Sequence, residues 1–266
     1  MKEIYTMWKY NNMVALTVLC AGVYMLFMLP FKSLQFIPGF SEFRPATLFP
    51  VLFGLLFGPA GAWGSALGNL AGDFFGTFSI GSIFGFAGNF LYAYIPYKIW
   101  RRQKFRHDND MSPTINSARK LVKFGATSVT SSIACAVVIA WGLDALRLVP
   151  FAALSTVISL NNIMITLLLG PIILPVIYRR VKKAGLLYTD IMDPQDISRP
   201  NPGKISIFMI YTGALGGFVS GLVISLVFTG QVMVGSSLST SGSGSLIVEI
   251  GVLPFLVVLL YGAFNS

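Results

Sequence analysis

The sequence predicts an all-α membrane protein, a polytopic helical bundle of about eight spans with both termini cytoplasmic. Three observations lead to this prediction. Of the 266 residues, 55% are hydrophobic and only 11% are charged, and the mean hydropathy is +0.73. The apolar residues form long continuous runs, and most Lys and Arg residues flank these runs on one side. Since a soluble domain carries about 25% charged residues, most of this chain is expected to lie in a bilayer.

Eight apolar segments predict the spans, because a membrane-crossing helix needs about 20 mostly apolar residues. The second and third are short, and Gly58 and Pro59 between them predict a tight turn. Continuous apolar runs argue against membrane strands, which would alternate in polarity. The first segment is too long for a cleaved signal peptide and is expected to stay in the membrane. The predicted spans are residues 12–30, 46–58, 60–76, 79–99, 122–143, 151–178, 205–229 and 246–263.

The basic residues predict the orientation in the cell membrane. With the amino terminus inside, only Lys32, Arg44 and Arg147 of the 19 Lys and Arg residues fall on the outer side. Lys and Arg are retained on the cytoplasmic side during insertion, so both termini are predicted to be cytoplasmic. Topology and anionic lipid thus account for the net charge of +9, and no nucleic-acid partner is expected.

The segments divide the chain into three predicted parts. Residues 1–183 form a six-helix substrate-binding membrane bundle. Residues 184–204 contain Pro and Asp and form a cytoplasmic linker. Residues 205–266 form a two-helix extension, whose helices are joined by the polar, flexible stretch GSSLSTSGSGS.

Motifs of enzymes are absent from the sequence. It contains no G-x-x-x-x-G-K-[ST] phosphate loop, no H-E-x-x-H and no G-x-S-x-G. The single histidine, His107, lies in a basic loop, and the two cysteines lie singly within spans. No catalytic residues, metal site or cofactor are therefore predicted, and any ATP hydrolysis is expected to belong to another chain.

The third span carries a glycine every four residues, at Gly64, Gly68, Gly72 and Gly76. Such a stripe lets another backbone approach closely, so these glycines are interpreted as a packing face.

Asp73 and Asn69 belong to a polar stripe on that same span. Carboxylates in spans are costly and usually face a cavity or a partner. Asn89 and the pair Asn161–Asn162 also fall within spans. Buried amides must hydrogen-bond, so these residues either join helices to one another or bind a ligand. Both interpretations stay open, and Asp73 could also simply reach the outer interface.

The outer loop FKSLQFIPGFSEFRPATLFP carries Glu42 and Arg44 among aromatic residues and prolines. Because this loop is so apolar, we expect it to fold over the bundle as a lid. Glu42 and Arg44 could pair with each other, or point down to meet Asp73 and Asn69 at the mouth of a pocket. A polar constellation under an apolar cover is typical of a small-molecule site.

The stretches RPATLFPVLFGLLFGPAGAWGSALGNLAGDFFG and GSIFGFAGNFLYAYIPYKIW resemble the S-component, the substrate-binding membrane subunit, of energy-coupling factor (ECF) transporters. The resemblance covers roughly the first 180 residues. It implies six helices that bind a vitamin or related micronutrient from the outer side. It also implies two kinds of partner, a membrane T-component and cytoplasmic ATPase subunits.

Matched to the family, the loop from Lys32 to Pro45 corresponds to its outer loop, and the third, fourth and sixth spans to its binding helices. The family commonly carries an A-x-x-x-A contact surface for the T-component in its first helix. The nearest equivalent here is Thr17-x-x-x-Ala21. Two spans after residue 204 also depart from the family's usual six. The substrate-binding residues that the resemblance implies are Glu42, Arg44, Asn69, Asp73, Asn89, Tyr92 and Asn162.

The function predicted is that of the substrate-capture subunit of an ECF-type importer, which is not an enzyme. The loop from Phe31 to Pro45 is expected to act as a gate, and a cationic or amine-bearing group of the ligand to lie near Asp73. The alternative is a self-contained proton- or ion-coupled secondary transporter, because an intramembrane carboxylate can carry a coupling proton. A membrane enzyme is a third, weaker alternative.

Overall fold

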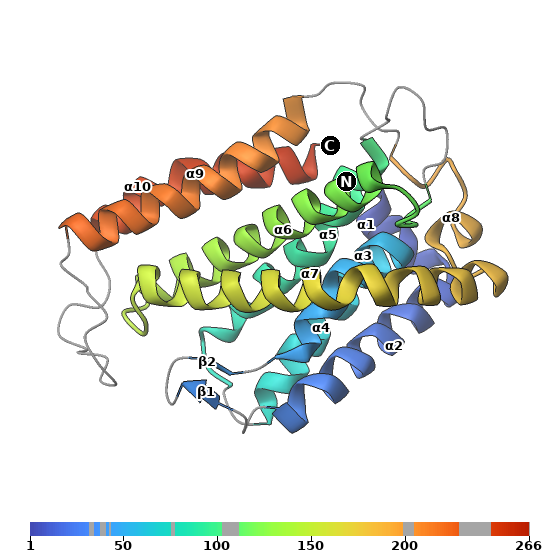
Figure 1. Ribbon diagram of the computed structural model, residues 1–266, viewed down its shortest axis with the longest axis horizontal. Coiled ribbons are helices and arrows are strands. Elements are labelled where there is room, and N and C mark those ends of the chain that lie inside the picture. Colours follow the sequence, from blue (N-terminus) through green and yellow to red (C-terminus); the bar gives the residue numbers. More distant parts are fainter. Residues whose placement is uncertain are drawn as a thin grey trace.

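The computed structural model describes residues 1–31, 35–37, 41–42, 44–75, 78–102, 112–198, 205–228 and 246–265. The described chain is a bundle of helices (Figure 1), which confirms the all-helical class. Each predicted span corresponds to one helix. These helices are α2 (Asn11–Met28), α3 (Leu48–Phe57), α4 (Pro59–Phe74), α5 (Ser82–Arg102), α6 (Ala118–Ala145), α7 (Phe151–Lys183), α9 (Ile205–Phe228) and α10 (Leu246–Phe264).

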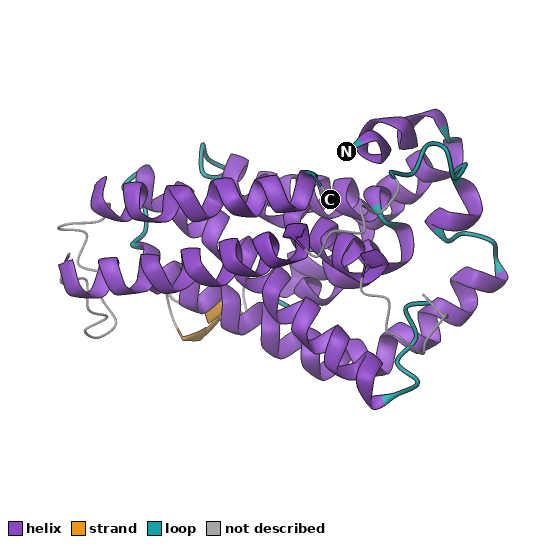
Figure 2. Ribbon diagram, turned by 90° about the horizontal axis from the view of Figure 1, so that it is seen from above, coloured by secondary structure: helices purple, strands orange, loops and turns teal. Residues whose placement is uncertain are grey.

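Shorter elements connect these helices. The helices α1 (Lys2–Thr6) and η1 (Met7–Lys9) precede α2, and η2 (Leu29–Phe31) follows it. The helix η3 (Pro45–Thr47) leads into α3, and α8 (Tyr188–Ile191) follows α7. Strands β1 (Gln35–Ile37) and β2 (Ser41–Glu42) pair antiparallel within the predicted lid. Figure 2 shows these strands at the edge of the bundle, away from both termini.

Five helical segments of the described chain are long and apolar enough to cross a membrane. They are residues Asn11–Phe31, Ala118–Ala145, Phe151–Ile191, Ile205–Val227 and Leu246–Phe264. The helix α4 has only 16 residues, which gives a length of about 24 Å, less than the ~30 Å hydrocarbon core. The eight helical segments are thus confirmed, whereas the number of full spans and the side on which the termini lie stay predictions.

The glycine stripe of α4 packs against α2. A Cβ added at Gly64 would lie 2.4 Å from the Cβ of Cys20, and one at Gly68 would lie 2.7 Å from the carbonyl oxygen of Ala21. These glycines therefore permit a backbone approach that no larger residue allows, which confirms their interpretation as a packing face. Gly76 lies outside the described residues.

The carboxyl-terminal pair α9 and α10 lies side by side along one edge of the bundle (Figure 1) and packs on α6. It shares a buried core with α5, α6 and α7, in which Ile210 and Val252 lie with Ile95, Val137 and Phe151. Near the start of α10, the carbonyl of Glu249 accepts a hydrogen bond from Trp141 Nε1 at 3.2 Å. The pair is therefore built into the bundle, although the predicted division of the chain into three parts stays a prediction.

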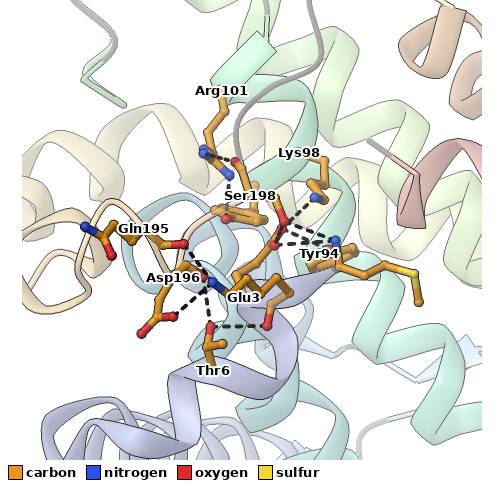
Figure 3. A network of polar contacts seen from close by, with 11 residues as sticks. Glu3, Thr6, Tyr94, Lys98, Arg101, Gln195, Asp196 and Ser198 are labelled. Carbon is orange, nitrogen blue, oxygen red and sulfur yellow. Dashed lines mark hydrogen bonds and ion pairs between the residues drawn. The ribbon is translucent and has the colours of Figure 1, made fainter.

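Both chain termini lie at one end of the bundle, as Figure 1 shows. The Phe264 ring stacks on Tyr94 with centroids 5.6 Å apart, and the hydroxyl of Tyr94 donates to Glu3 Oε1 at 3.3 Å. Glu3 Oε1 also accepts from Lys98 Nζ at 2.6 Å, and Ser198 donates to Glu3 Oε2 (Figure 3). We call this end, which carries the termini and the last turns of α5 and α7, the basic end.

Candidate substrate-binding site

The loop before α3 ends inside the bundle. Thr47 is buried, and its carbonyl oxygen accepts a hydrogen bond from Oγ1 of Thr166, a fully buried residue of α7, at 3.4 Å. Thr47 Oγ1 in turn donates to the carbonyl of Arg44 at 2.9 Å. The amino-terminal end of α3 therefore lies in the interior, where Thr47 and Leu48 are buried and the N–H of Leu48 is bonded to carbonyls of η3.

Tyr92 lies beside this point and joins three helices. Its hydroxyl lies 2.8 Å from Thr166 Oγ1, accepts from Ser132 Oγ of α6 at 3.3 Å and donates to the carbonyl of Asn162 at 3.4 Å. The Asn162 side chain lies near the thiol of Cys135. All these side chains are buried, so α5, α6 and α7 meet in a polar layer.

A second polar layer connects α2, α4 and α5. Asn69 Nδ2 donates to Asp73 Oδ2 at 3.4 Å. Tyr24 OH of α2 donates to Asn89 Oδ1 at 3.0 Å, and Asn89 Nδ2 donates to the carbonyl of Gly85 at 2.9 Å. These bonds fix the orientation of the Asn89 amide and leave it one N–H and one lone pair for a further partner.

Longer-range electrostatic interactions connect the two layers. The Arg44 guanidinium is near enough to influence both the Tyr24 hydroxyl and the Cys135 thiol, and the Asp73 carboxylate is near enough to influence Tyr24. Burial decreases along the cluster: Asn89 is buried, Asp73 is half-buried and Arg44 is exposed. The cluster therefore approaches the surface on the Asp73 side. We call it the polar cluster; it consists of Tyr24, Arg44, Asn69, Asp73, Asn89, Tyr92, Ser132, Cys135, Asn162 and Thr166.

The polar cluster faces away from the basic end. The helix α4 begins next to Gly58, where an added Cβ would lie 3.1 Å from the rings of Tyr97 and Tyr188. Both tyrosines line a cavity at the basic end. Asp73, near the last residue of α4, therefore lies toward the opposite end, which the charge distribution predicts to be the outer one.

Six of the seven predicted binding residues take part in the polar cluster, namely Arg44, Asn69, Asp73, Asn89, Tyr92 and Asn162. The side chain of Glu42 lies outside the described residues, although its backbone pairs with that of Gln35 in the small hairpin. Contact of any of these residues with a ligand stays a prediction.

Sequence reasoning missed the cluster residues Tyr24, Ser132, Cys135 and Thr166. A signal for two of them was present. Ser132 belongs to the run TSSIAC, which places three consecutive hydroxyl residues in an apolar span. Thr166 follows Asn162 by one helical turn and so shares its face. No comparable pattern singled out Tyr24, whose role depends on the packing of α2 against α5.

Thr17 and Ala21, the predicted contact residues for a T-component, face α4. Thr17 is 1% exposed, and an added Cβ on Gly64 would lie 2.8 Å from its carbonyl oxygen. The exposed face of α2 carries Val18, Leu19 and Leu26 instead. Docking of a partner on α2 stays a prediction, and such docking would meet this apolar face first.

The part of the chain that the structure describes holds no group of three or more His, Cys, Asp or Glu side chains that could bind a metal ion. The thiols of Cys20 and Cys135 are free of disulfides, and both are buried. The polar cluster offers hydrogen-bonding groups, namely one carboxylate, one guanidinium, three amides and several hydroxyls.

Comparison with known families identifies the class of this helical bundle as the S-components of ECF transporters. A model of the QueT transporter family matches residues 14–179. The chain therefore belongs to this family, whose members are ECF S-components for a queuosine precursor. Searches of curated proteins and of solved structures gave no match.

The family match confirms the resemblance seen in the sequence and the prediction that the chain is not an enzyme, because the family is one of transporters. Its S-components bind a small-molecule substrate and work with T-component and ATPase modules. The matched residues contain every member of the polar cluster, and α9 and α10 lie beyond them.

Proposed function

We propose that this chain captures a queuosine precursor from the outer side of the cell membrane. Delivery is powered by a separate T-component and ATPase subunits. The observation that carries the proposal is the convergence of five helices, α2, α4, α5, α6 and α7, on one polar cluster inside the family-matched region. The absence of a phosphate loop from the full sequence supports an external source of energy.

The chemistry of the cluster suits a deazaguanine base, the core of queuosine. Such a base presents N–H donors and a carbonyl acceptor on its edge and a flat apolar face. The Asp73 carboxylate and the oriented Asn89 amide supply acceptors and donors for that edge. A precursor with an aminomethyl substituent would also place a cation near Asp73, where a charge-assisted hydrogen bond adds affinity.

The segment before α3 supports a role as a gate. Arg44 stands at the point where the loop enters the bundle, and its carbonyl anchors Thr47. Movement of the loop would therefore move a charged group and the start of α3 together. Closure over the ligand would exclude water and strengthen the polar contacts beneath it.

The first test is to identify what the chain carries from cells. The full chain, purified from cells grown in rich medium, is denatured, and the released small molecules are identified by mass spectrometry. A near-stoichiometric deazaguanine supports the proposal. A different single metabolite, or no release together with no binding of added deazaguanine, contradicts it.

A pair of variants connects that binding with the polar cluster. Asp73→Asn should weaken binding of the aminomethyl deazaguanine on the order of tenfold or more, since hydrogen bonds to charged groups are worth about 1.5–3 kcal/mol. Asp190→Asn, an exposed position of α8 near the basic end, is the matched control and should bind normally.

Transport assays distinguish the alternatives. Vesicles that contain this chain alone should accumulate no deazaguanine when a proton gradient is imposed. Accumulation under those conditions would favour the self-contained secondary transporter. Chemical conversion of the ligand by the purified chain would favour a membrane enzyme.

A further inference from the structure

A cavity of about 450 Å³ lies at the basic end, between the last turns of α5 and α7. The helix α8 and the adjoining linker form another wall. A neighbouring cavity of about 690 Å³ shares Arg101, Thr189 and Ile197 with it. Arg101 therefore stands where the two cavities adjoin, at the far end of the bundle from the proposed substrate site.

Arg101 is held in one position by two hydrogen bonds. Its Nη1 donates to the hydroxyl of Tyr97 at 2.6 Å, and its Nη2 donates to the carbonyl of Ser198 at 2.9 Å (Figure 3). The guanidinium also lies 5.0 Å from the centroid of the Tyr97 ring. Within the described part of the chain, these side-chain hydrogen bonds use two of its five N–H donors.

The described residues that line this cavity include two basic side chains, Arg101 and Lys182, and one acidic side chain. Among the described residues, no carboxylate oxygen lies within 4.0 Å of the Arg101 guanidinium or of Lys182 Nζ. Lys182, in the last turn of α7, lies over the Tyr178 ring at 5.7 Å. Asp190 is the acidic residue among the described residues of the lining, and it accepts a hydrogen bond from Thr189 at 3.5 Å.

The walls between these charges are aromatic, with Tyr97, Trp100, Tyr178 and Tyr188 in the lining. Trp and Tyr side chains prefer the boundary between the hydrocarbon core and water. Lys123 Nζ lies 4.3 Å from the centroid of the Trp100 ring and adds positive charge behind that wall. The cavity thus combines a fixed guanidinium, a flexible ammonium and an amphipathic lining at the expected cytoplasmic surface.

We propose that this cavity binds the phosphate headgroup of an anionic phospholipid. A phosphodiester matches the planar donors of Arg101, and Lys182 supplies the second charge. Basic pockets between membrane helices on the cytoplasmic side are suited to such headgroups. The acyl chains would lie along the apolar outer surface of α7, where Ile172 and Val176 are exposed.

A bound headgroup would have a structural effect as well. The cavity is lined by α5 and α7 on one side and by α8 and Ile197 on the other. A headgroup would therefore tie the linker, which leads to α9, to the ends of two membrane helices. The inference rests on this cavity alone and does not depend on the identity of the transported substrate.

The test measures binding of short-chain phosphatidylglycerol to the full chain in detergent. Arg101→Gln should weaken it on the order of tenfold. Lys182→Gln should weaken it about fivefold, since one basic residue near a lipid surface is worth about 1 kcal/mol. Lys183→Gln changes the neighbouring lysine, which does not line the cavity, and should bind normally.

Three results would overturn the proposal. The first is equal binding of phosphatidylcholine, the second is unchanged binding in both cavity variants, and the third is binding of glycerol phosphate as tight as that of the lipid. The last result would assign the cavity to a soluble phosphate compound instead. Thermal unfolding in lipid-free detergent shows whether each variant folds. If the Arg101 variant does not fold, the Lys182 variant still tests the proposal, because Lys182 is exposed.

Discussion

The buried ion pair between Glu3 and Lys98 fastens the amino-terminal helix α1 to α5. The Glu3 Oε1–Lys98 Nζ distance is 2.6 Å, and the two side chains are 0% and 2% exposed. Replacement of Glu3 by Gln keeps the size of the side chain but removes its charge. The buried Lys98 ammonium then loses the carboxylate that lies against it, which is costly unless α1 opens to admit water.

The size of this effect follows from the carboxyl group's pKa. Burial of Glu3 opposes its ionisation, but the Lys98 ammonium and hydrogen bonds from Lys98 and Ser198 outweigh burial and lower the pKa of Glu3 from 4.5 to about 2. At about 1.36 kcal/mol per pH unit, this difference corresponds to ~3 kcal/mol. Loss of one partner from a buried pair costs a similar amount, about 3–5 kcal/mol.

Amide hydrogen exchange is the suitable assay, because α1 can open locally without global unfolding. A loss of ~3 kcal/mol should speed exchange in residues 2–9 on the order of 100-fold, with no change in the core of α6. The double variant Glu3→Gln with Lys98→Met removes both charges and should recover much of the protection. Unaltered exchange in α1 of the single variant would refute the reasoning.

Three further predictions concern the Glu3 carboxyl group, the Tyr92 hydroxyl and the packing of α4 against α2. Since the pKa of Glu3 is lowered on folding, its contribution to α1 protection should be complete above about pH 4.5 and should decline as the pH falls toward about 2, as exchange corrected for intrinsic rates would show. Tyr92→Phe leaves the hydroxyls of Ser132 and Thr166 without this partner, so stability in thermal unfolding or affinity for deazaguanine should fall by about 1–3 kcal/mol. Gly68→Leu would meet the α2 backbone and should abolish a stable bundle in size-exclusion chromatography, whereas Gly22→Ala, with nothing within 4 Å of the added Cβ, should behave normally.

The sequence predicted the helices well, because a membrane-spanning helix needs a long apolar run and little else. The four-residue spacing of glycines on α4 likewise determines which face can meet α2. Six of the predicted binding residues lie in one polar cluster for a related reason. Polar residues such as Asn69 and Asp73 are conspicuous against an apolar background.

Features that depend on tertiary packing could not be predicted in this way. The sequence does not indicate that Thr47, the residue before α3, lies deep enough in the bundle to accept a hydrogen bond from Thr166. Glu3 and Lys98 are 95 residues apart, and no pattern in the sequence pairs them. No pattern in the sequence distinguishes Tyr24 from other tyrosines in spans, because its role depends on the hydrogen bond that its hydroxyl donates to Asn89.

Calorimetric titration of the purified full chain with the aminomethyl deazaguanine tests the central claim most directly. Guanine serves as the competitor that lacks the substituent. We predict saturable binding at one site per chain, weakened on the order of tenfold by Asp73→Asn and unchanged by Asp190→Asn. Absence of binding to the wild-type chain, or equal binding by both variants and the wild type, would contradict a substrate site at the polar cluster.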